Sequence, residues 1–218
     1  MARSEAARTA LLDAAERLFA EAGIAQVSDR RVAEEAGNTN HSAVHYYFGG
    51  REGLLRALVT RHGIALEEPR RAMFARSDSV LDDVRSLVMP SMDALAALPR
   101  PSWRARFLNQ AINDPATATL MRESTESVPT ATLIARSVAS RLAHLDQGVV
   151  TARASLIALI VATACSEVEA RAERGGQDPR WHSVGDFLSD AITGMLLAPI
   201  SQAGSRNPLT ETPTPPVP

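Results

Sequence analysis

The first part of the chain alternates apolar and polar positions with the period of an α-helix. The pattern predicts a helix over residues 4–22, with an apolar face formed by Leu11, Ala14, Ala15, Leu18, Phe19 and Ala22. Gly23 follows the last of these positions, and glycine is the residue that most often ends a helix. We therefore expect this helix to pack against the elements that come next.

Two short helices are predicted beyond Gly23, over residues 29–36 and 41–48. Ser28 is a favourable N-cap for the first of them, and Gly37 is expected to end it. A polar turn, Asn-Thr-Asn, separates the two helices, and a pair of glycines at 49–50 ends the second. A fourth helix is expected to begin near Arg51. The three helices before residue 50, with a tight glycine-containing turn between the last two, predict a helix–turn–helix motif.

The rest of the chain is also predicted to be helical. Helical periodicity covers residues 80–98, 103–114, 115–128, 130–145, 149–173 and 181–197, and Pro90 is expected to kink the first of these helices. No segment has the alternation typical of a strand. The tail, residues 201–218, contains five of the 13 prolines and is predicted to be disordered. The expected fold class is therefore all-α.

Composition and charge exclude several classes of protein. The net charge of −2 gives no overall positive field, so any contact with nucleic acid must come from a local patch. The single cysteine, Cys165, excludes a disulfide within the chain. The N-terminus has no apolar signal-peptide core, and the longest apolar run, residues 154–165, is too short to span a bilayer. We expect a cytoplasmic protein.

The segment AGNTNHSAVHYYFGGREGLL, residues 36–55, carries the most distinctive chemistry. His41 and His45 have the i, i+4 spacing of a metal site, but zinc would need a third ligand, and none follows. Ser42 beside either histidine could imitate a nucleophile and its base, but no nucleophile-elbow pattern surrounds it. We therefore expect neither an enzyme nor a bound cofactor or metal.

A surface that reads DNA is the better interpretation of the same segment. Val44 and Phe48 supply a buried face, which leaves polar side chains outward at Asn38, Thr39, Asn40, His41, Ser42, His45 and Tyr46. Such side chains can donate to and accept from base edges, and the N–H groups at helix starts bind phosphates. The alternative is a polar capping segment of an ordinary helical bundle.

The run LLDAAERLFAEAGIAQVSDRRVAEEAG, followed by HYYFGGREGLLRALV, resembles the N-terminal DNA-binding domain of the TetR (tetracycline-repressor) family of transcription regulators. The resemblance covers residues 8–60. It implies a DNA-binding domain over residues 1–50, a larger helical ligand-binding and dimerisation domain over residues 51–200, and a homodimer on a roughly palindromic DNA operator. It also implies phosphate contacts by Ser28, Tyr47 and Arg51. His41, Ser42, His45 and Tyr46 are the expected groove readers, with turn contacts from Asn38, Thr39 and Asn40.

The segment departs from the family pattern in three places. One extra residue lies between Gly37 and Tyr47, His45 replaces the usual aromatic residue, and Arg51 replaces the usual lysine. The extra residue leaves open which bases are read.

The family pairs through its last two long helices, and the sequence agrees with this. The run SLIALIVATAC, residues 155–165, is apolar almost all round, so it needs burial on every side. The predicted interface residues are Ala158, Ala162, Leu188, Ile192 and Met195. A purely intramolecular core is the alternative.

A ligand pocket is expected between the middle helices. Large, adaptable side chains suit an apolar ligand, and the predicted lining is Met89, Met92, Trp103, Phe107, Gln110 and Met121. Plain core packing of these residues is the alternative. The sequence thus predicts a repressor that a small organic effector of unknown identity releases from DNA. The alternatives are a DNA-binding regulator with no small-molecule effector, and an all-α enzyme or carrier using the C-terminal cavity.

Overall fold

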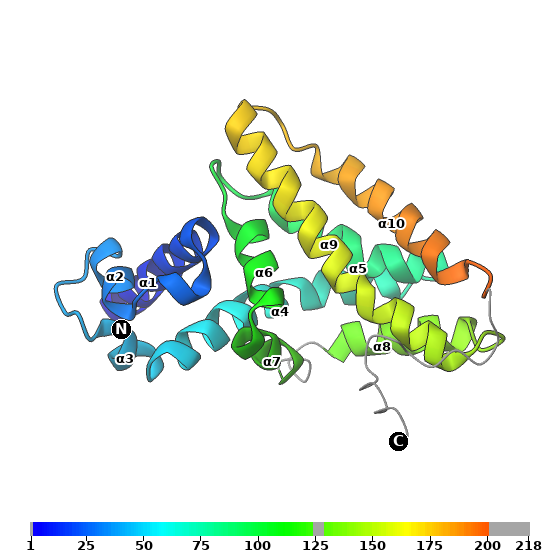
Figure 1. Cartoon of the computed structure of the whole chain (residues 1–218), viewed down its shortest axis with the longest axis horizontal. Helices are drawn as coiled ribbons and strands as arrows, with labels where there is room; N and C mark the ends of the chain where they lie inside the picture. The colour runs from blue at the N-terminus through cyan, green and yellow to red at the C-terminus, as the bar shows by residue number, and fades with distance from the viewer. Residues whose placement is uncertain (1, 124–128, 201–218) are drawn as a thin grey trace, which may run out of the picture.

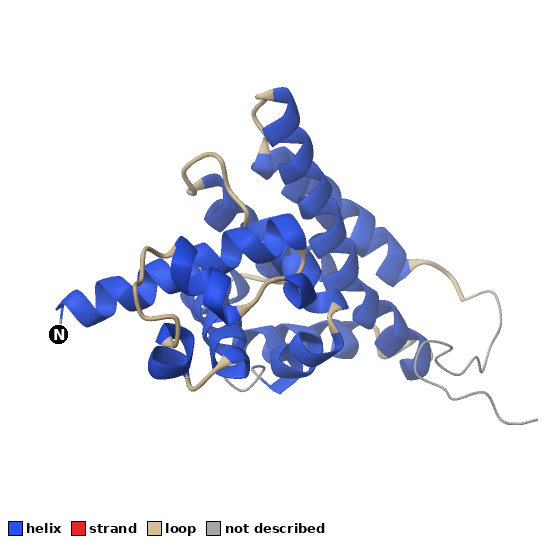
Figure 2. Cartoon of the chain, turned by 60° about the vertical axis from the view of Figure 1, so that its left-hand side comes forward, coloured by secondary structure: helices blue, strands red, loops and turns tan. Residues whose placement is uncertain are grey.

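The computed structural model describes residues 2–123 and 129–200, so the predicted disordered tail, residues 201–218, lies outside the described residues. Every regular element in the described part of the chain is a helix (Figure 2). The prediction of an all-α fold is confirmed. The helices follow one another with short connections, and two groups of them surround two separate hydrophobic clusters.

The N-terminal group consists of α1 (Ala2–Ala22), a short 3₁₀ helix η1 (Ile24–Gln26), α2 (Asp29–Glu35) and α3 (Ala43–Phe48). Gly23 ends α1 with a φ of 89°, a conformation that glycine adopts without strain. The apolar face predicted for the first helix is buried, apart from Ala22, which is exposed. Together these short helices enclose the first cluster, which includes Leu11, Leu18, Phe19, Val32, Ala33 and Val44.

Helix α4 (Arg51–Phe74) runs from the N-terminal group into the rest of the molecule (Figure 1). Its 24 residues span about 36 Å at 1.5 Å per residue. Leu54, Leu55 and Leu58 in its first half belong to the first cluster, together with Phe107 from a later helix. The core around the N-terminal helices therefore extends past residue 50, where the sequence suggested a domain boundary.

The second group consists of α5 (Val80–Ala96), α6 (Arg104–Asn113), α7 (Pro115–Glu123), α8 (Pro129–Arg141), α9 (Gln147–Gly175) and α10 (Trp181–Leu197). Helix α5 packs against α4, α8 and α10, so it is the central helix of this group. It continues through the buried Pro90. The second cluster includes Val84, Val88, Met92, Ile134, Leu188 and Ile192.

Capping residues explain most of the helix boundaries. The side chains of Ser28, Ser79 and Asp146 each accept a hydrogen bond from a backbone N–H in the first turn of α2, α5 and α9. Because Asp146 is the cap, α9 begins at Gln147, two residues before the predicted start. It ends where Gly176 adopts a left-handed conformation, with a φ of 59°. Residues 124–128, the end of the predicted 115–128 helix, lie outside the described part of the chain.

Candidate nucleic-acid interface and effector cavity

Helix α2 is fixed to the core by its buried face. Val32 and Ala33 are fully buried in the first cluster, and the Ser28 hydroxyl accepts a hydrogen bond from the Arg31 N–H at 3.2 Å. Gly37, with a φ of 67°, turns the chain away from the helix. Helix α2 can therefore brace the segment that follows it.

Two asparagine side chains order the turn between α2 and α3. The Asn38 side-chain oxygen accepts a hydrogen bond from the Asn40 N–H, and the Asn40 side-chain oxygen accepts one from the Ser42 N–H, both at 3.0 Å. These consecutive Asx-turns hold His41 and Ser42 outside the helix, so α3 begins at Ala43. The sequence had placed the helix start at His41. The extra residue is thus accommodated in the turn, and His41 and His45 do not share a helix face.

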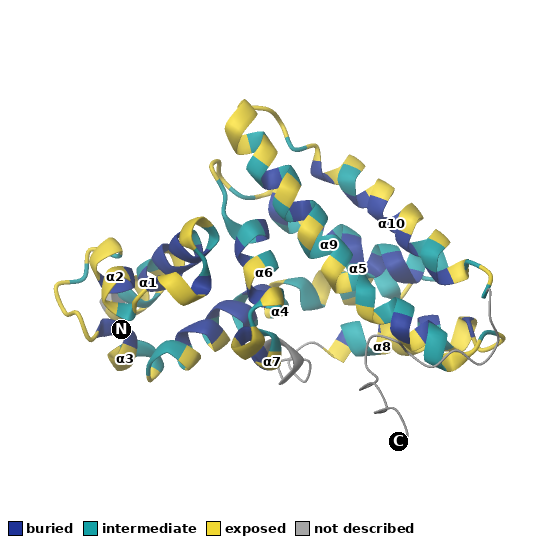
Figure 3. Ribbon diagram, viewed as in Figure 1, coloured by how far each residue is buried: buried dark blue, intermediate teal, exposed yellow. Residues whose placement is uncertain are grey.

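Helix α3 presents one buried and one exposed face. Ala43 and Val44 are fully buried, whereas His45 is exposed and Tyr46 is 75% exposed. The Tyr46 and Tyr47 rings meet edge to face, with their centroids 4.9 Å apart. The predicted contact residues that lie exposed are Ser28, Thr39, Asn40, His41, Ser42, His45 and Tyr46, and Asn38 and Tyr47 are half-buried. Figure 3 shows this exposed strip at the end of the molecule that carries α2 and α3.

The metal interpretation has no geometric support in the described residues. They contain no group of three or more His, Cys, Asp or Glu side chains placed to hold a metal ion. His41 Nδ1 lies 3.7 Å from a carboxylate oxygen of Glu34, which Arg30 also contacts at 2.8 Å. His41 therefore lies beside the Arg30–Glu34 ion pair on the edge of α2.

The side chain of Arg51, predicted to bind phosphate, also has contacts within the protein. Its guanidinium lies 4.3 Å from the centroid of the Phe19 ring, 3.3 Å from Asp29 Oδ1, and donates to the carbonyl oxygen of Ile24. These contacts tie the start of α4 to η1, to α2 and to the core. A phosphate would have to engage the guanidinium in competition with them, and the predicted phosphate contact stays a prediction.

Sequence reasoning missed three residues at this surface. Arg30 and Arg31 lie exposed in the first turns of α2, and Arg31 has no ion pair within 4 Å in the described part of the chain. A basic pair two and three residues after the N-cap Ser28 was the available signal. Gly53, in the first turn of α4, packs against the carbonyl of Phe48 so closely that a Cβ would collide with it. No sequence pattern indicates that contact.

An ionic cluster joins the N-terminal helices to the second group. Glu16 Oε2 on α1 lies 2.6 Å from Arg61 Nη2 and 2.7 Å from His62 Nε2, both on α4. The His62 nitrogen is close enough for a charge contact, although it is not aligned for a hydrogen bond. Arg104 Nε on α6 lies 3.7 Å from the other oxygen of Glu16. One carboxylate thus connects three helices.

Burial and these neighbours shift the pKa values in the cluster. Burial by itself would raise the pKa of Glu16, but the contacts with His62, Arg61 and Arg104 lower it to about 2. Burial lowers the pKa of His62, and this outweighs the opposite effect of Glu16. The carboxylate is therefore firmly ionised at neutral pH.

A cavity of about 380 Å³ lies directly beyond this cluster. Its walls come from α4, α5, α6, α8 and α9, and they are mainly aliphatic, with Leu87, Val88, Leu108, Ile157 and Val161 among them. His62 and Arg104 belong both to the lining and to the ionic cluster. The cavity is thus in direct contact with the groups that hold α1.

Only some of the predicted ligand-binding residues line the cavity. Met92 lines the cavity, whereas Met89 packs against Gly185 of α10 and Phe107 is fully buried in the first cluster. The Trp103 ring lies beside the guanidinium of Arg17, whose Cζ is 5.8 Å from the ring centroid. Gln110 lies beside Gly23 and does not line the cavity, and the side chain of Met121 lies outside the described part of the chain. Helical spacing could not separate cavity-facing from core-facing side chains, because both point inward.

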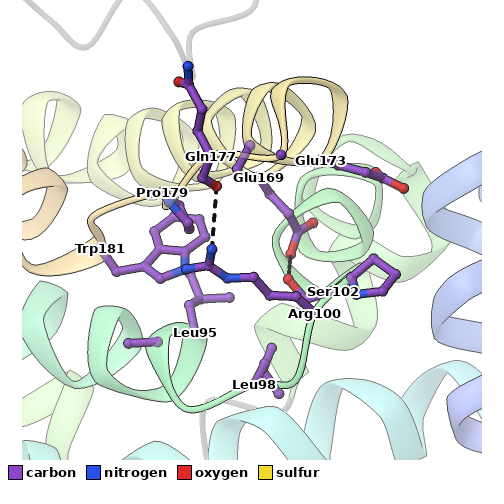
Figure 4. Close-up of a pocket in the computed structure, with 13 residues that line it drawn as sticks. Leu95, Leu98, Arg100, Ser102, Glu169, Glu173, Gln177, Pro179 and Trp181 are labelled. Carbon is purple, nitrogen blue, oxygen red and sulfur yellow. Dashed lines mark hydrogen bonds between the residues drawn. The ribbon is translucent and has the colours of Figure 1, made fainter.

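A second pocket, of about 350 Å³, lies where the α5–α6 and α9–α10 connections meet (Figure 4). The buried Glu169 accepts hydrogen bonds from the Ser102 hydroxyl at 2.8 Å and from the Arg106 N–H at 3.0 Å, so it caps α6. Arg100 donates to the carbonyl of Gln177 at 3.4 Å and to Asp178 at 2.8 Å. These polar groups satisfy one another, and the pocket is a structural junction.

The predicted dimer residues need correction on α10. Leu188 and Ile192 are 3% and 1% exposed, because they face α5 within their own protomer. Ala158 and Ala162 line the cavity, but Ala158 is also exposed, and Met195 is half-buried. The large apolar side chains that are exposed on the last two helices are Leu159, Phe187 and Leu197. The periodicity identified an apolar helix but not which of its faces is covered.

Helix α9 is also long and apolar enough to cross a membrane by length and composition, which the short apolar run in the sequence did not suggest. Only 17% of its most apolar window is buried. Its polar side chains are tied into the fold: Arg153 donates to the carbonyls of Leu196 and Ala198, and Glu169 caps α6. Its apolar surface therefore needs another cover.

The braced α2, the ordered turn and the exposed face of α3 define a helix–turn–helix, DNA-binding class of protein. Residues 11–58 match the family described as bacterial regulatory proteins, tetR family. No curated relative matches the sequence. The chain thus carries the N-terminal domain of the tetR family.

Solved structures extend the likeness to the whole fold. A TetR-family transcription regulator from Marinobacter aquaeolei VT8 has 16% identity and a TM-score of 0.59, covering 87% of this chain and 96% of that one. A putative tetR family transcription regulator from Shewanella sp. PV-4 has 16% identity and a TM-score of 0.58, covering 86% and 95%. The fatty acid degradation regulator FadR from Bacillus halodurans has 15% identity and a TM-score of 0.53, also covering 86% and 95%. The resemblance to TetR-family transcription regulators is confirmed.

Proposed function

We propose that the protein is a homodimeric transcriptional repressor that binds a roughly palindromic DNA operator and is released from it by a small organic effector. The observation that carries the proposal is the position of α4. Its first turn contacts the end of α3 through Gly53 and Phe48, and its later residues line the cavity. One continuous helix therefore touches both the DNA-reading element and the effector cavity.

The contacts along α4 suggest how binding is communicated. A ligand in the cavity would lie against His62 and Arg104, both of which contact Glu16 on α1. A shift of these side chains would change how α1 and α4 pack, and with them the position of α3. The effector would then favour a conformation in which the two reading helices no longer match successive major grooves, about 34–36 Å apart.

We propose that a second copy of the chain packs against the outer face of α9 and α10. Phe187 is 71% exposed, Leu197 is 50% exposed and Leu159 is 39% exposed, and these helices pack side by side at the end of the molecule away from α2 and α3 (Figure 1). A dimer through this face would leave both reading surfaces free. A protein with this function acts where the DNA is, in the cytoplasm of a bacterial cell.

Selection of binding sites from random double-stranded DNA tests the DNA-binding half of the proposal. We expect enrichment of one roughly palindromic sequence, bound by two copies of the chain. Enrichment of no sequence over the starting pool would refute it. Footprinting around the gene of the protein would then show whether the site overlaps a promoter, as a repressor requires.

Two alternatives make different predictions. A DNA-binding regulator with no small-molecule effector would bind the selected site but show no ligand-dependent stabilisation in a thermal-unfolding screen of metabolites. An all-α enzyme or carrier would bind a ligand in the cavity but would not distinguish the selected site from random DNA. The cavity beside the Glu16 cluster favours the ligand-responsive regulator over both.

A further inference from the structure

Basic side chains line the cavity, and acidic ones do not. Three basic side chains line it, His62, Arg70 and Arg104, and no aspartate or glutamate belongs to the lining. The other side chains in the walls are apolar or small and uncharged. The sequence alone did not mark this cavity with any charge, because the three basic residues are far apart along the chain and look like ordinary surface positions.

Two of the three basic groups already have a carboxylate partner. His62 and Arg104 both contact Glu16, at 2.7 Å and 3.7 Å. Arg70 has no ion pair within 4 Å in the described part of the chain, and its Nε is buried without a hydrogen-bond partner. Arg70 is thus the unpaired cation at the cavity.

One oxygen of the neighbouring carboxylate is bonded to another helix. Glu67 lies one turn before Arg70 on α4. Its Oε1 accepts hydrogen bonds from the N–H and the hydroxyl of Thr130 at the start of α8, and its Oε2 is buried without a hydrogen-bond partner among the described residues, with no ion pair to Arg70 within 4 Å. Burial lowers the pKa of Arg70, and the nearby Glu67 opposes this only in part. A buried guanidinium stays protonated, so it gains from an anionic partner.

The positions of the basic side chains and of the apolar walls indicate what kind of ligand fits the cavity. His62 and Arg70 are eight residues apart on α4, which corresponds to about 12 Å along the helix. Aliphatic side chains of α5, α6 and α9 form the walls of the cavity. A ligand that fits has an apolar body and one anionic end.

We propose that the cavity binds an apolar organic acid, with its carboxylate held by the guanidinium of Arg70 and its apolar body against the aliphatic walls of α5 and α9. This assignment rests on the proposed function of the cavity as the effector site. The cavity volume, about 380 Å³, is near the lower end of the range for small-molecule sites, so the acid is of medium length.

Three probes with the same chain and different head groups test the assignment on the full-length protein. Decanoate, decan-1-ol and decylamine are titrated into the wild type at pH 7.5 by isothermal calorimetry. Because a hydrogen bond to a charged group contributes about 1.5–3 kcal/mol, we expect decanoate to bind about ten-fold or more tightly than decan-1-ol. Decylamine should bind most weakly, since it brings a second positive charge.

Matched variants separate the role of Arg70 from a general charge effect. Arg70→Gln should lower the affinity for decanoate about ten-fold or more and leave that for decan-1-ol unchanged. Arg71→Gln removes the same charge from the next residue, which is exposed and paired with Glu68, and should change neither. Arg70→Lys keeps the charge and should retain the preference for decanoate. Circular dichroism confirms that each variant is folded.

The outcomes are distinct. The assignment is overturned if none of the three probes binds the wild type, if decan-1-ol binds as tightly as decanoate, or if Arg70→Gln and Arg71→Gln behave alike. DNA binding is measured on the same samples with the selected site. If decanoate binds through Arg70 but DNA affinity is unchanged, the ligand class stands and the proposed effector response fails.

Discussion

Glu16→Gln is the most informative single substitution, because Glu16 connects α1 to α4 and α6. The glutamine keeps the shape of the side chain but removes the negative charge that lies 2.6 Å from Arg61 and 2.7 Å from His62. It removes the carboxylate that Arg104 contacts and leaves Arg61 with only Asp13 as an ion-pair partner, which is costly in a site of low polarity. We expect the variant to fold with a clearly lower free energy of unfolding at pH 7.

The magnitude follows from the pKa of Glu16. Folding lowers it from 4.5 to about 2, a difference of 2.5, and at ~1.36 kcal/mol per unit the ionised carboxylate stabilises the fold by about 3 kcal/mol. Because the folded-state pKa is the lower one, this contribution is fully present above pH 4.5 and is lost as the pH falls toward 2. At pH 3 only about 1.4 kcal/mol of it should remain.

Urea unfolding followed by circular dichroism measures the effect at pH 7 and pH 3. The control is Glu21→Gln, which removes the same charge from an exposed i, i+4 pair on the same helix and should cost less than about 1 kcal/mol. At pH 7, a loss for Glu16→Gln no larger than that of the control would refute the reasoning. A large loss that does not shrink at pH 3 would show that shape or hydrogen bonding, and not charge, is responsible.

Four further substitutions test the reading surface and the dimer. Gly53→Ala should lower stability by about 1–3 kcal/mol in thermal unfolding, because its Cβ collides with the carbonyl of Phe48. His45→Ala should reduce discrimination between the selected site and mismatched DNA by about 1–3 kcal/mol in gel-shift titrations, with affinity for random DNA unchanged. Arg51→Ala should lower the stability of the N-terminal helices, and the salt dependence of its DNA binding tests the predicted phosphate contact. If the slope of log binding constant against log salt concentration falls by about one in this variant, Arg51 contacts a phosphate. Phe187→Asp should shift the sedimentation of the protein toward the monomer, and an unchanged dimer would exclude the α9–α10 face as the interface.

The sequence by itself determined the helices and the kind of DNA-reading element. Apolar periodicity placed the first helix on residues whose side chains are nearly all buried, and the residues that cap or end helices, such as Ser28 and Gly37, act where they were expected. These features depend on contacts between residues a few positions apart, so the order of residues along the chain is enough to predict them. The exposed polar face of α3 was predictable for the same reason, since its buried partner Val44 is on the same short helix.

Only the tertiary structure decided what those helices face. Leu188 and Ile192 look like an interface in the sequence but are covered by α5, because a helical stripe does not say which neighbour covers it. Arg51 has the chemistry of a phosphate ligand, yet residues more than 20 positions away hold its guanidinium. Glu16 and Arg70 gain their roles in the same way, from helices brought together across the chain. Burial and pairing between distant residues carry no local signature, so they appear only once the helices pack.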